Sequence, residues 1–120
     1  MKMKMTNEQM YDRVVVLSAL NEKGKLGYAI ARNRRKLENE IVEYSKLRSE
    51  ALTKYGSPIE GTSTYVVSGE NRVKYNEELA QYNDIETEVD VMQVSIDEFL
   101  SGNLDSNQMY ALDWMVDYGE

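Results

Sequence analysis

Residues 25–55, KLGYAIARNRRKLENEIVEYSKLRSEALTKY, contain no proline and one glycine, Gly27, and they decide the fold. Apolar side chains recur along this stretch at helical spacing: Leu26, Ile30, Leu37, Ile41, Tyr44, Leu47, Ala51 and Tyr55. Gly56 and Pro58 follow directly and end the pattern. The spacing predicts one long helix, which would extend about 45 Å at a rise of about 1.5 Å per residue.

Four residues of this stripe are spaced by seven, as in a coiled-coil seam: Ile30, Leu37, Tyr44 and Ala51. A compact domain of this length has a radius of gyration of about 14 Å, so the predicted helix is longer than such a domain is wide. Either the helix protrudes, or another helix or a second subunit covers its stripe. Because one short helix covers only part of such a stripe, we expect a homo-oligomer, in the first place a homodimer.

Shorter helices are predicted on both sides of the long one. Thr6 and Gln9 have the spacing of a capping box, which predicts a helix that starts there and that Gly24 ends. Residues 1–5 before this helix are expected to be disordered. Another helix is predicted at about residues 72–86, where Tyr, Leu and Tyr side chains share one face.

The remaining elements complete the predicted fold. Residues 89–96 are rich in β-branched side chains and roughly alternating, which predicts a short strand that pairs with residues 64–67. A last helix is predicted after Asp105 or Ser106, either of which is a favourable cap. The sequence therefore predicts a single α+β domain over residues 1–120, mostly α. Its long central helix packs against two or three shorter helices, with a small two-stranded antiparallel sheet.

The composition excludes several kinds of chemistry. The chain has no cysteine, which excludes disulfides and thiolate chemistry and is typical of cytosolic proteins, and it has no histidine, the commonest metal ligand and proton-transfer side chain. The longest apolar run, residues 14–17, is far too short to span a membrane. We therefore expect a cytoplasmic, non-enzymatic protein without a metal, a cofactor or a membrane partner.

Charge is distributed unevenly along the chain. Residues 1–74 hold all 14 basic residues and nine of the 21 acidic ones, whereas residues 75–120 hold twelve acidic residues and no basic one. A dense carboxylate surface can occupy a basic surface of a partner, or imitate the phosphates of a nucleic acid, but more often it is only a solvated face. The acidic and aromatic residues expected to bind a partner are Glu86, Glu88, Asp90, Asp97, Glu98, Asp113, Trp114, Asp117 and Tyr118.

Six basic residues with no acid between them lie before and within the long helix: Lys23, Lys25, Arg32, Arg34, Arg35 and Lys36. Such a cluster attracts phosphates, nucleic acid or an acidic protein surface. Two interpretations stay open. The cluster binds an anion such as a small phosphorylated ligand, or it pairs with the acidic half of this chain in the same or a neighbouring subunit.

The run KLGYAIARNRRKL, residues 25–37, continued by Glu43-Tyr44 and by Lys54-Tyr55-Gly56, resembles small uncharacterised proteins of phages and prophages of Gram-positive bacteria. In those proteins a similar long helix is followed by a second helix and by an acidic strand such as residues 88–92. The resemblance covers about residues 6–115. It implies a small phage product that acts in the infected cell, and it supplies no catalytic residues.

These observations lead to one main hypothesis and two alternatives. We expect a phage-encoded interaction protein that inhibits a host defence or nucleic-acid-handling complex by binding it with the acidic, aromatic-rich surface. The expected partner is a host protein or protein–nucleic-acid complex with a basic surface, and direct nucleic-acid binding is not expected. The first alternative is a homo-oligomeric binder of a small phosphorylated ligand or signalling nucleotide at residues 23–36. The second is a component of the virion or of its assembly.

Overall fold

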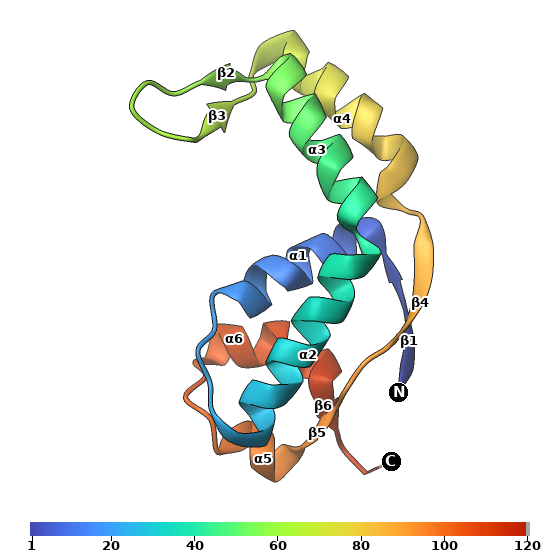
Figure 1. Cartoon of the computed structure of the whole chain (residues 1–120), viewed down its shortest axis with the longest axis vertical. Helices are drawn as coiled ribbons and strands as arrows, with labels where there is room; N and C mark the ends of the chain where they lie inside the picture. The colour runs from blue at the N-terminus through green and yellow to red at the C-terminus, as the bar shows by residue number, and fades with distance from the viewer. Residues whose placement is uncertain (120) are drawn as a thin grey trace.

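The long helix predicted over residues 25–55 is divided by a bend at Ile41. In the computed structural model, which describes residues 1–119, α2 (Gly24–Glu40) and α3 (Val42–Tyr55) follow each other but point in different directions (Figure 1). Ile41 has φ −105° and ψ 16°, outside the helical range, although its N–H still donates to the Leu37 carbonyl at 3.1 Å. The predicted extent is therefore correct, but the single straight helix is wrong.

The other elements give an α+β fold that is mostly α, as predicted. β1 pairs antiparallel with β4, β2 pairs antiparallel with β3, and β5 runs parallel to β6. The remaining helices and strands are, in chain order, β1 (Lys2–Thr6), α1 (Asn7–Ser18), β2 (Ser57–Pro58), β3 (Tyr65–Val66), α4 (Gly69–Asn83), β4 (Glu86–Asp90), β5 (Val94–Ser95), α5 (Ile96–Leu100), α6 (Ser106–Ala111), the short 3₁₀ helix η1 (Asp113–Met115) and β6 (Val116–Asp117).

The N-terminal segment is ordered, contrary to expectation. Lys2–Thr6 form β1, and the alternation of the strand turns Met5 fully into the core. The predicted capping box is present: the Thr6 hydroxyl accepts the Gln9 N–H at 3.1 Å, and the Gln9 side chain accepts the Thr6 N–H at 2.9 Å. α1 ends at Ser18, so Gly24 does not cap it; Gly24 is instead the first residue of α2 and has a positive φ of 66°.

The predicted pairing of residues 64–67 with residues 89–96 is wrong. β4 pairs with β1, and β3 pairs with β2 to form a small hairpin between α3 and α4. Because α4 runs from this hairpin back to β4, its 15 residues hold the two predicted partners about 22 Å apart at about 1.5 Å per residue.

α1, α2 and the C-terminal elements enclose one hydrophobic core, which forms the body of the molecule (Figure 1). Asp105 caps α6, as predicted, in a second capping box with Gln108. This last helix ends at Ala111, and η1 follows it. Large side chains that line the core include Met5, Met10, Leu17, Leu26, Ile30, Leu37, Val89, Val91, Phe99, Leu112 and Met115.

α3 and α4 form an antiparallel hairpin that projects from the body as an arm (Figure 1). The molecule measures 48 × 32 × 21 Å and has a radius of gyration of 16.6 Å, above the value of about 14 Å for a compact domain of this length. All four residues of the predicted seam are buried within the single chain. The uncovered stripe that motivated the homodimer is therefore absent, and the homodimer stays a prediction without that support.

Aromatic and polar contacts fix the base of the arm to the body. The Tyr44 hydroxyl donates to the Asn83 side chain at 2.6 Å and accepts from Arg48 at 3.2 Å, which links α3 to α4. The Arg48 guanidinium also lies 4.0 Å from the centroid of the Tyr11 ring, and the Tyr11 and Tyr44 rings meet edge to face at 6.1 Å. The arm therefore leaves the body at a defined angle.

Candidate functional site

Buried Asn33 sets the rotation of α2, which carries most of the predicted basic cluster. Its side-chain amide donates to the Met92 carbonyl and accepts the Met92 N–H, both at 2.8 Å. Asn33 is completely buried, together with the neighbouring apolar residues of α2. This side of the helix is therefore held against the segment that follows β4, and the opposite side faces solvent.

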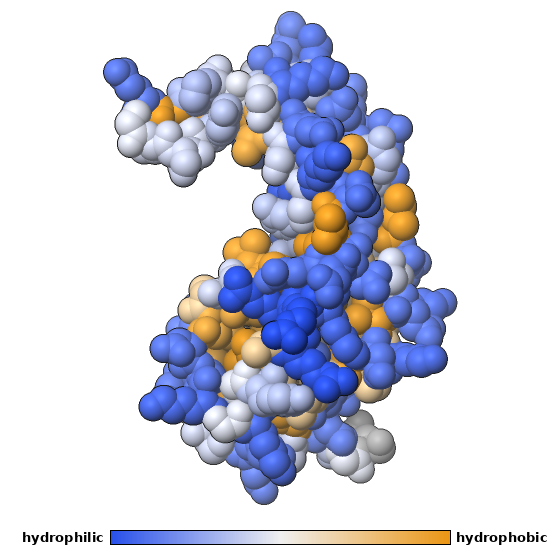
Figure 2. All heavy atoms as spheres, in the orientation of Figure 1, coloured by the Kyte–Doolittle hydropathy of each residue, from blue (hydrophilic) through white to orange (hydrophobic). Residues whose placement is uncertain are grey.

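The solvent-facing side of α2 carries a line of exposed residues that we name the outer face: Lys25, Tyr28, Arg32, Arg35 and Asn39. Their spacing of three or four residues places them along one side of a helix. Neither Glu38 nor Glu40 falls on this line, so the outer face holds three cations and no acid. Figure 2 shows the most hydrophilic side chains of that view gathered over α2, in the middle of the molecule.

The structure divides the six basic residues of the predicted cluster. Arg34 pairs with Glu38 at 2.5 Å, and the Lys36 ammonium donates to the Asp90 carbonyl at 2.7 Å. Arg32 and Arg35 form no ion pair or hydrogen bond within residues 1–119. The remaining two, Lys23 and Lys25, flank the first residue of α2 instead of the end of α1. Internal pairing therefore accounts for part of the cluster only.

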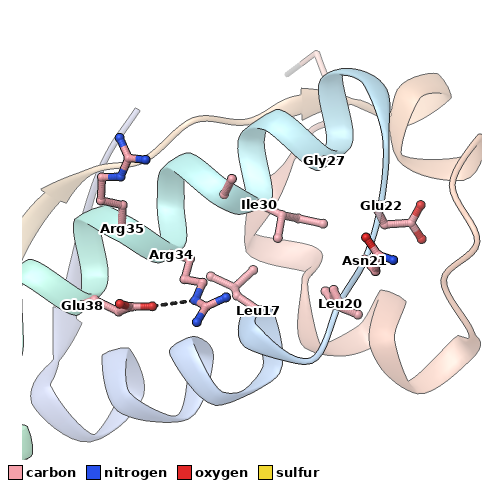
Figure 3. Close-up of a pocket in the computed structure, with 10 residues that line it drawn as sticks. Leu17, Leu20, Asn21, Glu22, Gly27, Ile30, Arg34, Arg35 and Glu38 are labelled. Atoms are coloured by element: carbon pink, nitrogen blue, oxygen red, sulfur yellow. Dashed lines mark hydrogen bonds and ion pairs between the residues drawn. The ribbon is translucent and has the colours of Figure 1, made fainter.

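A groove of about 420 Å³ lies beside the outer face, between the end of α1, the loop 19–23 and α2 (Figure 3). The Arg34–Glu38 pair lies at one end, while Arg35 points to the other side of α2. The Glu22 carboxylate accepts the Asn103 N–H at 2.8 Å. The loop packs directly on α2 because residue 27 is glycine: a methyl group there would lie 2.3 Å from the Glu22 carbonyl oxygen. Of the two arginines that line this groove, Arg34 is therefore already neutralised, whereas Arg35 has no acidic partner within residues 1–119.

The acidic residues of β4 face the lysines of β1. Lys2 lies opposite Asp90 and Lys4 opposite Glu88, and Lys2 also approaches Glu88 at 3.9 Å. The chain's terminal ammonium binds Asp90 at 3.0 Å and holds the pKa of that carboxyl below its usual range. Glu86 lies opposite Thr6 at the end of the ladder. The strand that was expected to present charge to a partner is therefore partly neutralised within its own sheet.

The C-terminal acids gather at one end of the body. β5 and β6 run side by side, with Ser95 next to Asp117, and α5 lies against β6. The Tyr118 hydroxyl donates to Asp113, and this hydrogen bond raises the pKa of Tyr118. Glu98 accepts a hydrogen bond from the Ser95 hydroxyl at 2.9 Å. The residues that stay exposed here, which we name the acidic end, are Asp97, Asp113, Asp117 and Tyr118.

Trp114 lies apart from these exposed residues. It is half-buried, packs against the hydrophobic core and carries the Arg13 guanidinium 4.9 Å from the centre of its ring. Its indole N–H is buried without a hydrogen-bond partner in the part of the chain that the structure describes. Because α6 ends at Ala111 and η1 follows it, Trp114 packs against the core, and its role in partner binding stays a prediction. The nine predicted contact residues thus lie in three places: β4, the α5–β6 end and, for Trp114, a half-buried position against the core.

Two exposed features were missed by sequence reasoning. The first is Tyr28, which lies on the outer face. Its spacing from Lys25 and Arg32 in the sequence could have predicted this position. The other feature is the end of the arm, residues 56–68, which we name the tip. The low charge of this segment in the sequence could have predicted an exposed contact surface, since Glu60 is the single charged residue of the tip.

Comparison of the chain with protein-family models, curated proteins and solved structures finds no match. Among residues 1–119, no helix is both long and apolar enough to cross a membrane. In the same residues, no group of three or more His, Cys, Asp or Glu side chains is arranged to hold a metal ion. The geometry of the exposed surfaces is therefore the basis for a functional proposal.

Proposed function

We propose that this protein is a non-enzymatic interaction protein that docks on a protein partner through the tip of its arm. The observation that carries the proposal is the contrast between the anchored base of the arm and its bare, nearly uncharged tip. A rigid scaffold that presents a loop is a common arrangement for binding.

The tip has the composition of an interface core. It exposes Ile59 and Val66, at 40% and 48%, and Tyr65 lies partly exposed beside them. Figure 2 shows this segment as mostly pale with apolar residues in orange, whereas the arm helices are mostly blue. Depletion of charge and enrichment of aromatic residues distinguish the centres of protein interfaces from the rest of the surface.

The fold itself does not require an apolar tip. None of residues 56–68 is buried, so their side chains add nothing to the hydrophobic core. Leaving Ile and Val side chains in water forgoes a stabilisation of about 25 cal/mol per Å² of apolar surface, which docking on a partner would recover. The tip is therefore better explained as a contact surface than as part of the packing.

The acidic end is the less favoured contact surface. It lies in the body and the tip at the far end of the arm (Figure 1), so one small partner cannot cover both along the 48 Å axis. Several acids outside the tip already serve as caps or hydrogen-bond partners within the chain. The resemblance to phage and prophage proteins leads us to propose a host protein, or a host protein–nucleic-acid complex, that is inhibited because the arm occupies its surface.

Capture of partners from a lysate of a Gram-positive host tests this proposal. Wild-type protein is compared with the double variant Ile59→Asp/Val66→Asp and with Ile96→Asp, a control of the same residue type that is 43% exposed in the body beside the acidic end. The double variant is expected to lose the captured protein, whereas the control retains it. Equal urea midpoints for all three chains show that folding is unaffected.

Two outcomes contradict the proposal. Loss of the partner in Ile96→Asp with retention in the tip variant would assign binding to the acidic end. Recovery of no specific protein by the wild type, at both low and moderate salt, would remove the arm as a docking element.

A further inference from the structure

We infer that the outer face of α2 is a binding site for single-stranded nucleic acid, separate from the tip. The inference rests on three properties of this face, which are its unpaired charge, its shape and the position of Tyr28. It revises the sequence-based expectation that the chain does not bind nucleic acid directly.

The charge of the outer face is available to a ligand. Lys25, Arg32 and Arg35 are exposed, and no ion pair or hydrogen bond holds their side chains within the residues 1–119 described. The nearby Arg34 is neutralised by Glu38, and the Lys36 ammonium keeps its charge but is held by the Asp90 carbonyl, so neither side chain is free to follow a ligand along the outer face. A row of cations without an intervening acid attracts phosphate groups.

The shape of the outer face suits a polymer rather than a small ligand. From Lys25 to Arg35 the helix rises about 15 Å, at about 1.5 Å per residue, which matches a few consecutive nucleotides. Small phosphorylated ligands are bound in concave sites that enclose most of their surface. Two concave sites border this face, and both hold acids beside their cations: Glu38 pairs with Arg34 in the groove of Figure 3, and Glu22 and Glu98 line a cavity of about 530 Å³ together with Lys23 and Lys25. A strand that follows the convex helix meets the unpaired charges instead.

Tyr28 distinguishes single strands from other polyanions. Its side chain is 60% exposed and lies between Lys25 and Arg32 on the same side of α2. Within residues 1–119 the hydroxyls of Tyr44 and Tyr118 form hydrogen bonds, whereas the Tyr28 hydroxyl has no partner there. Proteins that bind single strands without sequence preference combine basic residues along the backbone with aromatic rings on which bases stack. Bases inside a duplex are already stacked, and an acidic peptide offers carboxylates but no bases.

The net charge of the protein sets the expected affinity. A formal charge of −7 repels a polyanion at long range, so binding is local, weak and sensitive to salt. We expect a dissociation constant of about 1–100 µM, the range of non-specific nucleic-acid binding. With three cations in the site, the affinity falls with salt with a log–log slope of about −2, at about 0.7 per neutralised phosphate of a single strand.

Fluorescence anisotropy with a labelled oligothymidylate of 15 nucleotides, at 50 and 200 mM salt, tests the inference on the full chain. Arg32→Gln/Arg35→Gln is expected to weaken binding about tenfold or more and to reduce the salt slope by about 1.4. The matched control, Lys46→Gln/Lys74→Gln, removes the same charge from exposed positions of the arm and is expected to retain the wild-type affinity. Tip variants are also expected to bind normally, so the outcome is independent of the proposed function.

Substitutions at Tyr28 identify the ligand class. Tyr28→Ala is expected to weaken binding of the oligonucleotide about fivefold or more, because stacking is lost, whereas Tyr28→Phe keeps the ring and the affinity. A duplex of the same length is expected to compete less well than the single strand. No binding at 50 mM salt overturns the inference. So does equal competition by polyglutamate together with a silent Tyr28→Ala variant, which would assign the outer face to an acidic protein.

Discussion

The body and the arm are built from helices of similar length but are packed in different ways. In the body, α2 has 17 residues and buries five of them, whereas in the arm α4 has 15 residues and buries only Leu79. α2 is covered by α1, by the strands β4 and β5, and by α5. α3 and α4 cover mainly each other. The same apolar stripe of sequence thus enters two environments, and the stripe alone does not reveal how many neighbours cover it.

This difference predicts uneven stability within one chain. Segments with few buried apolar contacts open at lower free energy than a multi-sided core. The body therefore supplies most of the resistance to unfolding, and the arm depends on its base at Tyr44. The arm is therefore expected to open before the body does, although its base holds it at a defined angle in the folded state.

The largest expected effect is loss of core packing in the body. Leu37 is completely buried among residues from several elements, so Leu37→Ala is expected to lower the free energy of unfolding by about 3–5 kcal/mol. Leu79 is almost as buried, but the two arm helices can close around the gap, and Leu79→Ala is expected to cost only about 2 kcal/mol. Urea titrations measure both. Equal losses would show that the arm is packed as firmly as the body.

Removal of the buried amide in α2 is the next test of the body. Asn33→Ala leaves both the N–H and the carbonyl of Met92 without their partner in a buried site. The expected loss is about 2–3 kcal/mol, since an unsatisfied buried polar group costs about 1–3 kcal/mol. Asn39→Ala, at an exposed position of the same helix, is the control and is expected to leave the urea midpoint unchanged. A stable Asn33→Ala variant would mean that water replaces the amide and that α2 is less firmly oriented.

The features that were predicted correctly are those that depend on neighbours in sequence. Thr6 with Gln9 is a cap whose two partners lie three residues apart, and the same holds for the helix that Asp105 caps. The end of α3 follows from Gly56 and Pro58. Helix content and the mostly α fold class follow from periodicity, because an apolar stripe stabilises a helix against almost any neighbour.

The features that were missed depend on residues far apart in the chain. No proline or glycine marks the bend at Ile41, which is set by what the two halves pack against. β1 was invisible because it is stabilised by β4, from the other end of the sequence. That pairing also neutralises the acidic strand, so segregation of charge along the chain did not produce an equally segregated surface. For the basic cluster, the sequence identified the six residues, but it did not predict which of them form an ion pair or a hydrogen bond within the chain.

Removal of one hydroxyl at the base of the arm tests whether the arm opens independently of the body. Tyr44→Phe removes the group that donates to Asn83 and accepts from Arg48, at an expected cost of about 1 kcal/mol in global stability. Amide hydrogen exchange is expected to accelerate in α3 and α4 more than in α1 and α2, because the link between the arm helices is lost. Tyr75→Phe, whose hydroxyl has no partner within residues 1–119, is the control. Uniform acceleration in all four helices would show that body and arm open together.

The smallest effect concerns the far part of the arm, where Lys54 of α3 meets Glu78 of α4 at 3.2 Å. Tyr55 and then Glu78 hold the pKa of Lys54 above its ordinary range. A base with a raised folded pKa stabilises the protein while it is charged. This contribution is therefore complete below the ordinary lysine value of about 10.4 and is lost as pH rises through the folded value.

Because Lys54 is exposed, Glu78→Gln is expected to leave the urea midpoint at pH 7 unchanged within error. The sensitive measurement is an NMR titration of the lysine side chains, in which Glu78→Gln lowers the pKa of Lys54 while the neighbouring control Glu77→Gln does not. If the pKa of Lys54 is the same in wild type and Glu78→Gln, α3 and α4 separate beyond their base in solution. The arm would then present its tip on a flexible stem, and the docking proposal would lose the defined geometry on which it depends.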